Sequence, residues 1–238
     1  MRETLTYQAD GLAMKSELFF EPKSGTRAGV LVYPEAYGLN QHALQRAQRL
    51  ASLGYVALAC DLHGEGRVVE DLGESIKMLD PLYADPSKTR ARAIGGLKAL
   101  AARAEIDAAR IGTIGFCFGG TMSLELARSG ADIKGVVGFH SGLGTVAPKT
   151  DAKAIKARIL VCIGGDDPFI PLEQRAAFES EMRDAGVDWQ MNVYGNTVHS
   201  FTNLTAANAK RPNAVRYSEE ADRRSWKAMQ NFFEEAFA

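Results

Sequence analysis

Cysteine is scarce in this chain, and neither sign of charge is in excess. Three cysteines among 238 residues are too few for a disulfide framework and favour a reducing compartment. Two of them, Cys60 and Cys162, lie inside apolar runs, so we expect them in the core. The 28 lysines and arginines almost cancel the 29 acidic residues, which leaves a net charge of −1. Such a chain has no long-range attraction to nucleic acid or to an anionic membrane. We therefore expect a cytoplasmic protein that binds neither.

Long apolar runs are missing as well. The opening segment MRETLTYQAD carries charges and hydroxyls where a signal peptide needs an apolar stretch, and no later run is long enough to cross a bilayer. Metal-ligand spacings such as H-E-x-x-H are also lacking, although His42, His63 and His140 lie near the ends of expected elements. The sequence therefore predicts no membrane contact and no metal site.

The chain does have a regular alternation of short apolar runs and segments with helical spacing. The runs are rich in Val, Ile and Leu, and most are too uniformly apolar for strands with one exposed face. They cover 28–33, 55–60, 111–115, 133–139, 159–164 and 187–194, and the helical segments cover 41–53, 87–104, 121–128 and 171–185. This α/β alternation predicts a mostly parallel sheet with helices on both faces. Residues 5–20 alternate apolar and polar side chains around Asp10-Gly11, which predicts an antiparallel hairpin at one edge.

We expect a single domain over residues 1–238, built on a doubly wound sheet of about eight strands. No repeat, low-complexity tract or Pro- or Gly-rich linker divides the chain, and an amphipathic helix is expected at about 218–237. The acidic stretch 61–85 is the least regular segment, and we expect a long loop there with one short helix. Long loops in compact domains are often functional, so this stretch is a candidate lid over a ligand site.

A glycine-rich turn, Ile114-Gly115-Phe116-Cys117-Phe118-Gly119-Gly120, lies between an expected strand and an expected helix. It fits the nucleophile-elbow pattern, in which a sharp strand-to-helix turn holds the central nucleophile in a strained conformation. Gly115 and Gly119 leave room for the strand and the helix to approach closely. The helix N-terminus would favour a thiolate at Cys117. For an isolated G-x-C-x-G segment, the alternative interpretation is a small buried core cysteine.

Two further segments at strand ends supply an acid and a base. The turn Gly165-Asp166-Asp167-Pro168 follows one expected strand, and His199 follows the next. The order of nucleophile, acid and histidine is that of α/β-hydrolase triads. The carboxyl ends of parallel strands are also where open α/β sheets bind their ligands. We therefore predict a triad of Cys117, His199 and either Asp166 or Asp167.

Together these segments resemble the dienelactone hydrolase family, which comprises cysteine members of the α/β-hydrolase superfamily. The resemblance extends over nearly the whole chain and rests on Pro34-Glu35-Ala36-Tyr37-Gly38, Gly115 to Gly120, Gly164 to Pro171 and His199-Ser200-Phe201. It implies an α/β-hydrolase fold without a large cap domain. It also implies that Asp167, which precedes x-x-x-Pro, is the acid of the triad, and that Glu35 lies beside the cysteine and helps to govern its proton.

The same resemblance implies a class of substrate. Family members that act on dienelactone hold its carboxylate with arginines, one of them four positions after the catalytic histidine, where this chain has Asn203. Other candidates for such an anchor are Arg67, Arg90 and Arg92. Further residues expected to contact the substrate are Tyr37 and Phe201. The expected substrate is a small ester or lactone, with dienelactone as one candidate.

We expect acyl transfer at this site. Cys117, activated by His199, would attack an ester or lactone carbonyl, and water activated by His199 would hydrolyse the resulting thioester. The backbone N–H groups of Phe118 and Ala36 would form the oxyanion hole. Side-chain and backbone groups fill every role, so no cofactor is expected. The alternatives are a general carboxylesterase or thioesterase on the same fold, and a non-hydrolytic protein in which Cys117 is a redox or ligand-binding thiol. We expect a monomer or a weak homo-oligomer.

Overall fold

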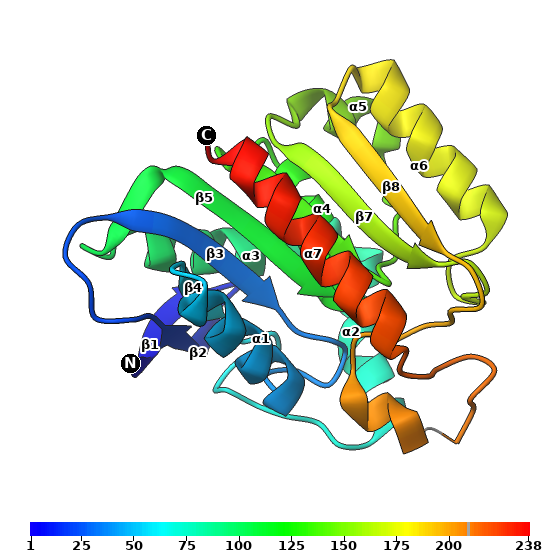
Figure 1. Cartoon of the computed structure of the whole chain (residues 1–238), viewed down its shortest axis with the longest axis horizontal. Coiled ribbons are helices and arrows are strands. Elements are labelled where there is room, and N and C mark those ends of the chain that lie inside the picture. Colours follow the sequence, from blue (N-terminus) through cyan, green and yellow to red (C-terminus); the bar gives the residue numbers. More distant parts are fainter. Residues whose placement is uncertain (209) are drawn as a thin grey trace.

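Eight strands form one sheet, in the order β1-β2-β4-β3-β5-β6-β7-β8 (Figure 1). The structure is a computed structural model and describes residues 1–208 and 210–238. The strands are β1 (Arg2–Ala9), β2 (Leu12–Phe19), β3 (Arg27–Tyr33), β4 (Val56–Ala59), β5 (Ile106–Phe116), β6 (Gly135–Phe139), β7 (Arg158–Gly164) and β8 (Trp189–Tyr194). The strands from β3 to β8 are parallel, whereas β1 and β2 form an antiparallel hairpin that joins the sheet through β4.

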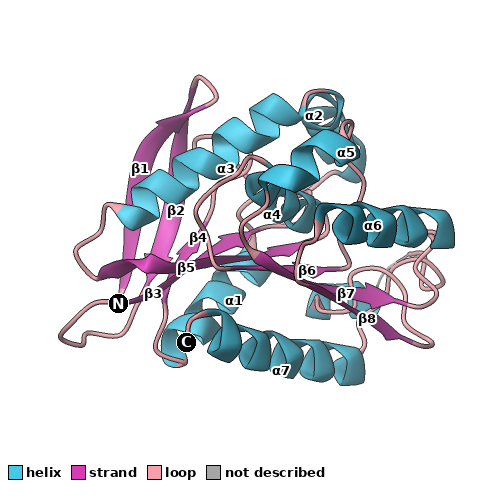
Figure 2. Ribbon diagram, turned by 90° about the horizontal axis from the view of Figure 1, so that it is seen from above, coloured by secondary structure: helices cyan, strands magenta, loops and turns pink. Residues whose placement is uncertain are grey.

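Helices cover both faces of this sheet (Figure 2). They are α1 (Gln41–Ser52), α2 (Leu72–Ala84), α3 (Pro86–Ala101), α4 (Phe118–Arg128), α5 (Pro148–Asp151), α6 (Leu172–Ala185) and α7 (Glu219–Ala236), with short 3-10 segments η1 (Ala152–Ala154) and η2 (Leu204–Asn208). On one face, α1 and α7 pack around a core that includes Trp226 and Phe233. On the other face, α3, α4 and α6 pack around a core that includes Leu100 and Phe178. Of the helices in the described residues, none is long and apolar enough to span a membrane.

The central strands are uniformly apolar because both of their faces are buried. Every residue of β4 and β6 is buried, whereas the edge strand β8 has exposed residues along its length. Parallel strands need crossover connections, and the helices that supply them cover the sheet. The apolar runs of the sequence are therefore a direct consequence of this layered packing.

Local signals determine where several elements begin and end. Asn40 caps α1 by accepting the N–H of Ala43 at 3.3 Å. Gly186 ends α6 in the left-handed conformation, with φ of 71°, which glycine adopts without steric cost. Asp10 and Gly11 also have positive φ, and this backbone matches the twist of the hairpin that they connect.

The fold class predicted from the sequence is confirmed, but the helix within residues 61–85 is longer than expected. The irregular part of 61–85 is shorter than expected, because Asp71 caps α2 by accepting the N–H of Glu74 at 2.8 Å and α2 then continues for 13 residues. Pro81 lies inside this helix, and proline in a helix interior weakens the helical signal of a sequence. A full-length helix therefore replaces the short helix expected in this stretch.

The carboxyl ends of the parallel strands meet at one edge of the sheet. Loops or turns that follow β3, β5, β6, β7 and β8 carry, in that order, Glu35, Cys117, His140, Asp167 and His199. Residues far apart in the chain thus come together at a position that the sheet topology dictates.

Candidate active site

Cys117 lies at a sharp turn between β5 and α4. Its backbone has φ of 53° and ψ of −119°, a conformation that residues other than glycine hold only when their surroundings enforce it. Two glycines permit this turn. A Cβ atom on Gly115 would lie 2.0 Å from the carbonyl oxygen of Gly119, and a Cβ atom on Gly119 would lie 2.2 Å from that of Tyr33. The Cys117 side chain is partly exposed, so a nucleophile elbow presents a thiol at a helix N-terminus.

Asp167 and His199 meet at the same edge of the sheet. The Nδ1 atom of His199 donates to Oδ2 of Asp167 at 2.8 Å, and Asp167 is only 3% exposed. The second oxygen of Asp167 accepts the N–H of Phe169 at 2.9 Å. Asp166 is exposed. Of the two candidate acids, Asp167 is therefore the one placed against the imidazole.

The surroundings of His199 favour its protonated form. Burial by itself lowers the pKa of the imidazole, but the negative charge and hydrogen bond of Cys117 and the contact with Asp167 together raise the pKa of His199 to about 10. The rings of Phe169 and His140 pack edge-on against His199, with centroid distances of 5.1 and 5.0 Å. The imidazole is thus held by the carboxylate and by these two rings.

Glu35 is buried beside the loop that carries His199. It is 3% exposed, and its two oxygens accept hydrogen bonds from the hydroxyl of Ser200 at 3.1 Å and from the amide of Asn203 at 2.5 Å. Burial, followed by the charges of Glu35 and Cys117, raises the pKa of Tyr37. Two neutral donors therefore hold the Glu35 carboxylate against the loop that carries His199.

The sequence predicts two backbone N–H groups as an oxyanion hole, those of Phe118 and Ala36. Phe118 is the first residue of α4, so its N–H has no acceptor inside the helix. Ala36 lies in the loop after β3, and its carbonyl accepts a hydrogen bond from Nε2 of His63 at 2.8 Å. His63 therefore fixes the backbone of a loop that the sequence singled out only for Glu35, Ala36 and Tyr37.

Comparison with known proteins agrees with this geometry. Residues 16–237 match the model of the dienelactone hydrolase family. The chain belongs to this family. A probable 2-oxo-3-(5-oxofuran-2-ylidene)propanoate lactonase from a Bradyrhizobium species is 30% identical over 75% of each chain. A putative carboxymethylenebutenolidase from Methylorubrum extorquens is 29% identical over 86% of this chain and 70% of that one. Among solved structures, a dienelactone hydrolase-like promiscuous phosphotriesterase from metagenomic libraries is 42% identical, with coverage of 100% of this chain and 99% of that one and a TM-score of 0.95.

As a member of the dienelactone hydrolase family, the protein is a carboxylic-ester hydrolase, as the resemblance implied. None of the positions considered as an anchor for a substrate carboxylate offers an unpaired arginine among the described residues. Asn203 stands where an arginine was expected, and it donates to Glu35. The other three candidates already pair with acidic side chains: Arg67 with Glu74, Arg90 with Glu125 and Asp151, and Arg92 with Asp10. Each candidate anchor is therefore neutral or already neutralised.

Phe201 lies in the core, and the prediction that it contacts the substrate is wrong. Its side chain is fully buried and packs edge-on against the rings of His140 and Tyr194, at centroid distances of 5.1 and 5.8 Å. Between His199 and Phe201 the backbone turns at Ser200, whose φ is 54°. His199 therefore faces the site while the next aromatic side chain enters the interior.

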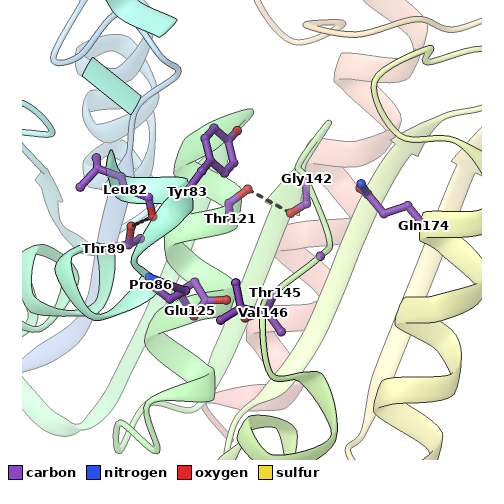
Figure 3. A pocket seen from close by; sticks show the side chains of 11 residues that line it. Leu82, Tyr83, Pro86, Thr89, Thr121, Glu125, Gly142, Thr145, Val146 and Gln174 are labelled. Carbon is purple, nitrogen blue, oxygen red and sulfur yellow. Dashed lines mark hydrogen bonds between the residues drawn. The ribbon is translucent and has the colours of Figure 1, made fainter. Parts of the chain in front are cut away.

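A cavity of about 320 Å³ lies beside the first turns of α4 (Figure 3). Its lining comprises Leu82, Tyr83, Pro86, Thr89, Thr121, Glu125, Gly142, Gly144, Thr145, Val146 and Gln174. Tyr83 connects this cavity to the start of α4, because its ring packs edge-on against that of Phe118 at a centroid distance of 4.8 Å. In Figure 3, Leu82 and Tyr83 lie across the cavity from Gln174, with Thr121 between them. A space of this size is suited to part of a small organic ligand.

The sequence reasoning missed a group of polar residues behind the triad. His140 follows β6, His42 and Arg46 lie on α1, and Thr202 follows His199 in the chain. Their hydrogen bonds connect positions 62 and 160 residues apart, so no local spacing could reveal them. The position of His140 at a strand end was the one available signal. No group of three His, Cys, Asp or Glu side chains suited to a metal ion occurs in residues 1–208 and 210–238.

The two remaining cysteines lie in the interior, as predicted. Cys60 and Cys162 are both buried. Burial raises the pKa of Cys60, and it raises that of Cys162 to about 12. Both thiols are therefore protonated at neutral pH, and neither resembles a resolving cysteine for Cys117.

Proposed function

We propose that this dienelactone hydrolase family member cleaves a neutral, activated ester or lactone with Cys117 as nucleophile, His199 as acid and base, and Asp167 as the group that orients the imidazole. The observation that carries this proposal is the 2.8 Å contact between Nδ1 of His199 and Oδ2 of Asp167. It commits Nδ1 to the acid and leaves Nε2 for Cys117, which is the division of labour that a nucleophilic triad needs.

The first half-reaction begins from the charged pair of Cys117 and His199. The thiolate attacks the carbonyl carbon, and the carbonyl electron pair becomes an oxyanion. Collapse of this intermediate breaks the bond to the leaving oxygen, which takes its proton from the His199 imidazolium. The products are a thioester on Cys117, the released alcohol or enol and a neutral His199. For a lactone, the released oxygen stays attached to the acyl chain.

The second half-reaction regenerates the enzyme. Neutral His199 takes a proton from a water molecule, and the oxygen of that water attacks the thioester carbonyl. Collapse expels the thiolate and releases the carboxylic acid, so the charged pair is restored. A thiolate leaves a tetrahedral intermediate more readily than an alkoxide does. The mechanism therefore favours substrates with stabilised leaving groups, such as enol lactones, aryl esters and thioesters.

The oxyanion lies between the N–H groups of Phe118 and Ala36 in this proposal. The first of these is a free donor at the start of α4, and the helix dipole adds to its effect. Removal of one such donor typically costs about 2.7–4 kcal/mol of transition-state stabilisation. The contact between Ala36 and His63 keeps the second donor in position before the substrate arrives.

The charges around the site favour a substrate whose acyl group is uncharged. Glu35 is buried, and Asn203 rather than a cation donates to it. Among the described residues that line the adjacent cavity, Glu125 is the charged one, and it pairs with Arg90 and Arg128. A substrate carboxylate placed here would lose its hydration without gaining a counter-ion. We therefore infer that the enzyme prefers uncharged esters to dienelactone itself.

The test is multiple-turnover hydrolysis of a neutral nitrophenyl ester by the wild type and by matched variants. We expect sustained turnover by the wild type and a loss of about a thousandfold or more in Cys117→Ala and Asp167→Asn, because triad members act as a unit. Asp166→Asn is the matched control, since this neighbouring carboxylate is exposed, and it should keep wild-type activity. A single burst from the wild type, or turnover that survives Cys117→Ala, would contradict the proposal and favour a redox or binding thiol.

A second candidate activity is the hydrolysis of phosphotriesters. It is favoured by the 42% identity over the full chain to the promiscuous phosphotriesterase. Phosphotriesters are also uncharged and carry good leaving groups, which suits the site described above. Replacement of the carboxylic ester by a nitrophenyl dialkyl phosphate in the same assay tests this activity, and loss of turnover in Cys117→Ala would assign both reactions to one nucleophile.

A further inference from the structure

Behind the catalytic residues, a continuous chain of hydrogen bonds connects the nucleophile elbow with α1. The backbone N–H of Cys117 is shared between the carbonyl of Phe139 at 3.0 Å and Nδ1 of His140 at 3.2 Å, and Nε2 of His140 lies 2.9 Å from the hydroxyl of Thr202. The same hydroxyl lies 3.3 Å from Nε2 of His42, and Nε of Arg46 donates to that nitrogen at 3.3 Å. His140 and His42 are both buried.

The positions of the hydrogens along this chain follow from its first donor. A backbone N–H can only donate, so the part of this shared hydrogen bond that reaches His140 assigns Nδ1 as an unprotonated acceptor. Nε2 of His140 then carries the hydrogen and donates it to the oxygen of Thr202. The Thr202 hydroxyl is left to donate its own hydrogen to Nε2 of His42.

The other end of the chain gives the same assignment independently. The guanidinium of Arg46 can only donate, so Nε2 of His42 is an acceptor and the hydrogen of His42 lies on Nδ1. That Nδ1 atom is buried without a hydrogen-bond partner among the described residues, and it lies 3.9 Å from Oε2 of Glu35. Both ends therefore require two neutral imidazoles, protonated on Nε2 in His140 and on Nδ1 in His42.

We propose that this chain makes His140 a positioning residue, which stays neutral and couples the backbone of Cys117 to the loop that carries His199. His140 is in contact with the edge of His199 and is bonded to Thr202 three residues further along the same loop. His199 is then the one imidazole beside Cys117 that takes the proton. The mechanistic part of this inference rests on the proposed function, whereas the tautomers follow from the contacts alone.

The charges that face His140 also favour its neutral form. The ring is fully buried, and this burial is the largest of the effects that hold the pKa of His140 well below its usual value; the positive charges of His199 and Arg46 add to it. Burial and Arg46 likewise lower the pKa of His42, although Glu35 opposes them. A proton on either ring would place two donors against each other, so the chain excludes the charged forms.

The first test reads the tautomers directly and needs no substrate. Two-bond 1H–15N correlation spectra of the wild-type imidazoles should show the hydrogen on Nε2 in His140 and on Nδ1 in His42, while His199 carries hydrogens on both nitrogens at pH 7. A spectrum with the His140 hydrogen on Nδ1, or with a doubly protonated His140, overturns the proposal. This result is independent of whether the protein hydrolyses any particular ester.

The second test compares Thr202→Val with Thr202→Ser. Valine keeps the shape of threonine and removes the hydroxyl, whereas serine retains it. The backbone carbonyl of residue 202 still accepts a hydrogen bond from Arg46 in both variants, so the loop keeps that contact.

We expect kcat for a neutral aryl ester to fall about tenfold in Thr202→Val with KM within about twofold, because the Nε2–H of His140 loses its acceptor. We expect kcat to recover in Thr202→Ser. Equal kcat values in both variants and the wild type would overturn the positioning role. Failure of the proposed function would appear separately, as turnover that survives Cys117→Ala.

Discussion

Three residues at the active-site edge adopt a backbone conformation that is rare outside glycine. Cys117, His140 and Ser200 have φ values of 53°, 41° and 54°. Such strain persists only where surrounding contacts over-determine the backbone, and each residue has such contacts. The N–H of Cys117 donates to Phe139 and His140, the N–H of His140 donates to the carbonyl of Cys162, and the Ser200 hydroxyl donates to Glu35. The strain thus aims the thiol and turns the loop of His199 toward it.

The pKa of the His199 imidazole is the first quantity to measure at the scale of single residues. The pKa of His199 is raised from 6.5 to about 10 in the folded protein. The stabilisation that this proton provides is therefore fully present below pH 6.5, and it is lost as the pH rises through about 10. In Cys117→Ala the thiolate charge is removed and burial remains, so His199 should release its proton at a lower pH. NMR titration of the imidazole signals measures both values.

His63 is the internal control for that titration. Its pKa is lowered by burial, partly offset by its contact with Ala36, and it should titrate at the same pH in the wild type and in Cys117→Ala. Coincident titration of His199 in the two proteins would contradict the charged pair with Cys117.

At the scale of elements, buried ion pairs tie α4 to its neighbours. The Arg128 side chain on α4 is completely buried and bonds to Glu125 on the same helix at 3.1 Å, to Glu181 on α6 at 2.7 Å and to the carbonyl of Leu143 at 2.8 Å. These contacts hold α6 and the loop after β6 against α4, the helix that follows Cys117. The geometry of the elbow and of the cavity thus depends on one buried cation.

Removal of that cation should destabilise the fold strongly. Arg128→Leu leaves the carboxylates of Glu125 and Glu181 buried with fewer partners, and we expect a loss of about 3–5 kcal/mol in the free energy of unfolding. Arg183→Leu is the control, because Arg183 is exposed and pairs with Glu179 across one helical turn, where a pair contributes about 0.3–0.5 kcal/mol. Urea denaturation followed by tryptophan fluorescence compares the two. A loss below about 1 kcal/mol in Arg128→Leu would show that the ion pairs are dispensable.

At the scale of the whole molecule, the sheet places the site at one edge, between two apolar cores. The cores lie on opposite faces of the sheet and make the central strands rigid. The site itself combines a thiol, a buried glutamate and a cavity whose charged lining residue, Glu125, is already paired. Nearly balanced charge over the whole chain adds no steering field for an anion.

This charge distribution predicts discrimination against anionic substrates. With two nitrophenyl esters of equal length, one ending in a carboxylate and one in the corresponding amide, we expect kcat/KM to be about tenfold or more higher for the amide, because the carboxylate meets Glu35 without a free cation. The difference should shrink in Glu35→Gln if that charge is responsible. Equal or faster hydrolysis of the carboxylate ester would show that an arginine rearranges to bind it.

Much of this arrangement was predictable from sequence because its signals are local. The runs of β4 and β6 are apolar because both faces are buried, and Gly115, Cys117 and Gly119 belong to one strand-to-helix turn, so their spacing is visible in the sequence. The order of Cys117, Asp167 and His199 then places three side chains at one edge through sheet topology alone. The sequence was misleading where packing determines the direction of a side chain. Phe201 faces the interior because the backbone turns at Ser200, and no periodicity in the sequence reveals that turn.

The sequence by itself determined the α/β layering, the position of the elbow and the family, since each depends on residues close together in the chain or on their order. The tertiary structure decided which of two adjacent aspartates contacts His199, that Asn203 serves Glu35, and that His42, His140 and Thr202 form one chain of hydrogen bonds. These partners lie 32 to 168 residues apart. Their pairing is settled only when the sheet and its two helical layers pack together, because a buried polar group must then find a partner among whatever the fold brings within reach.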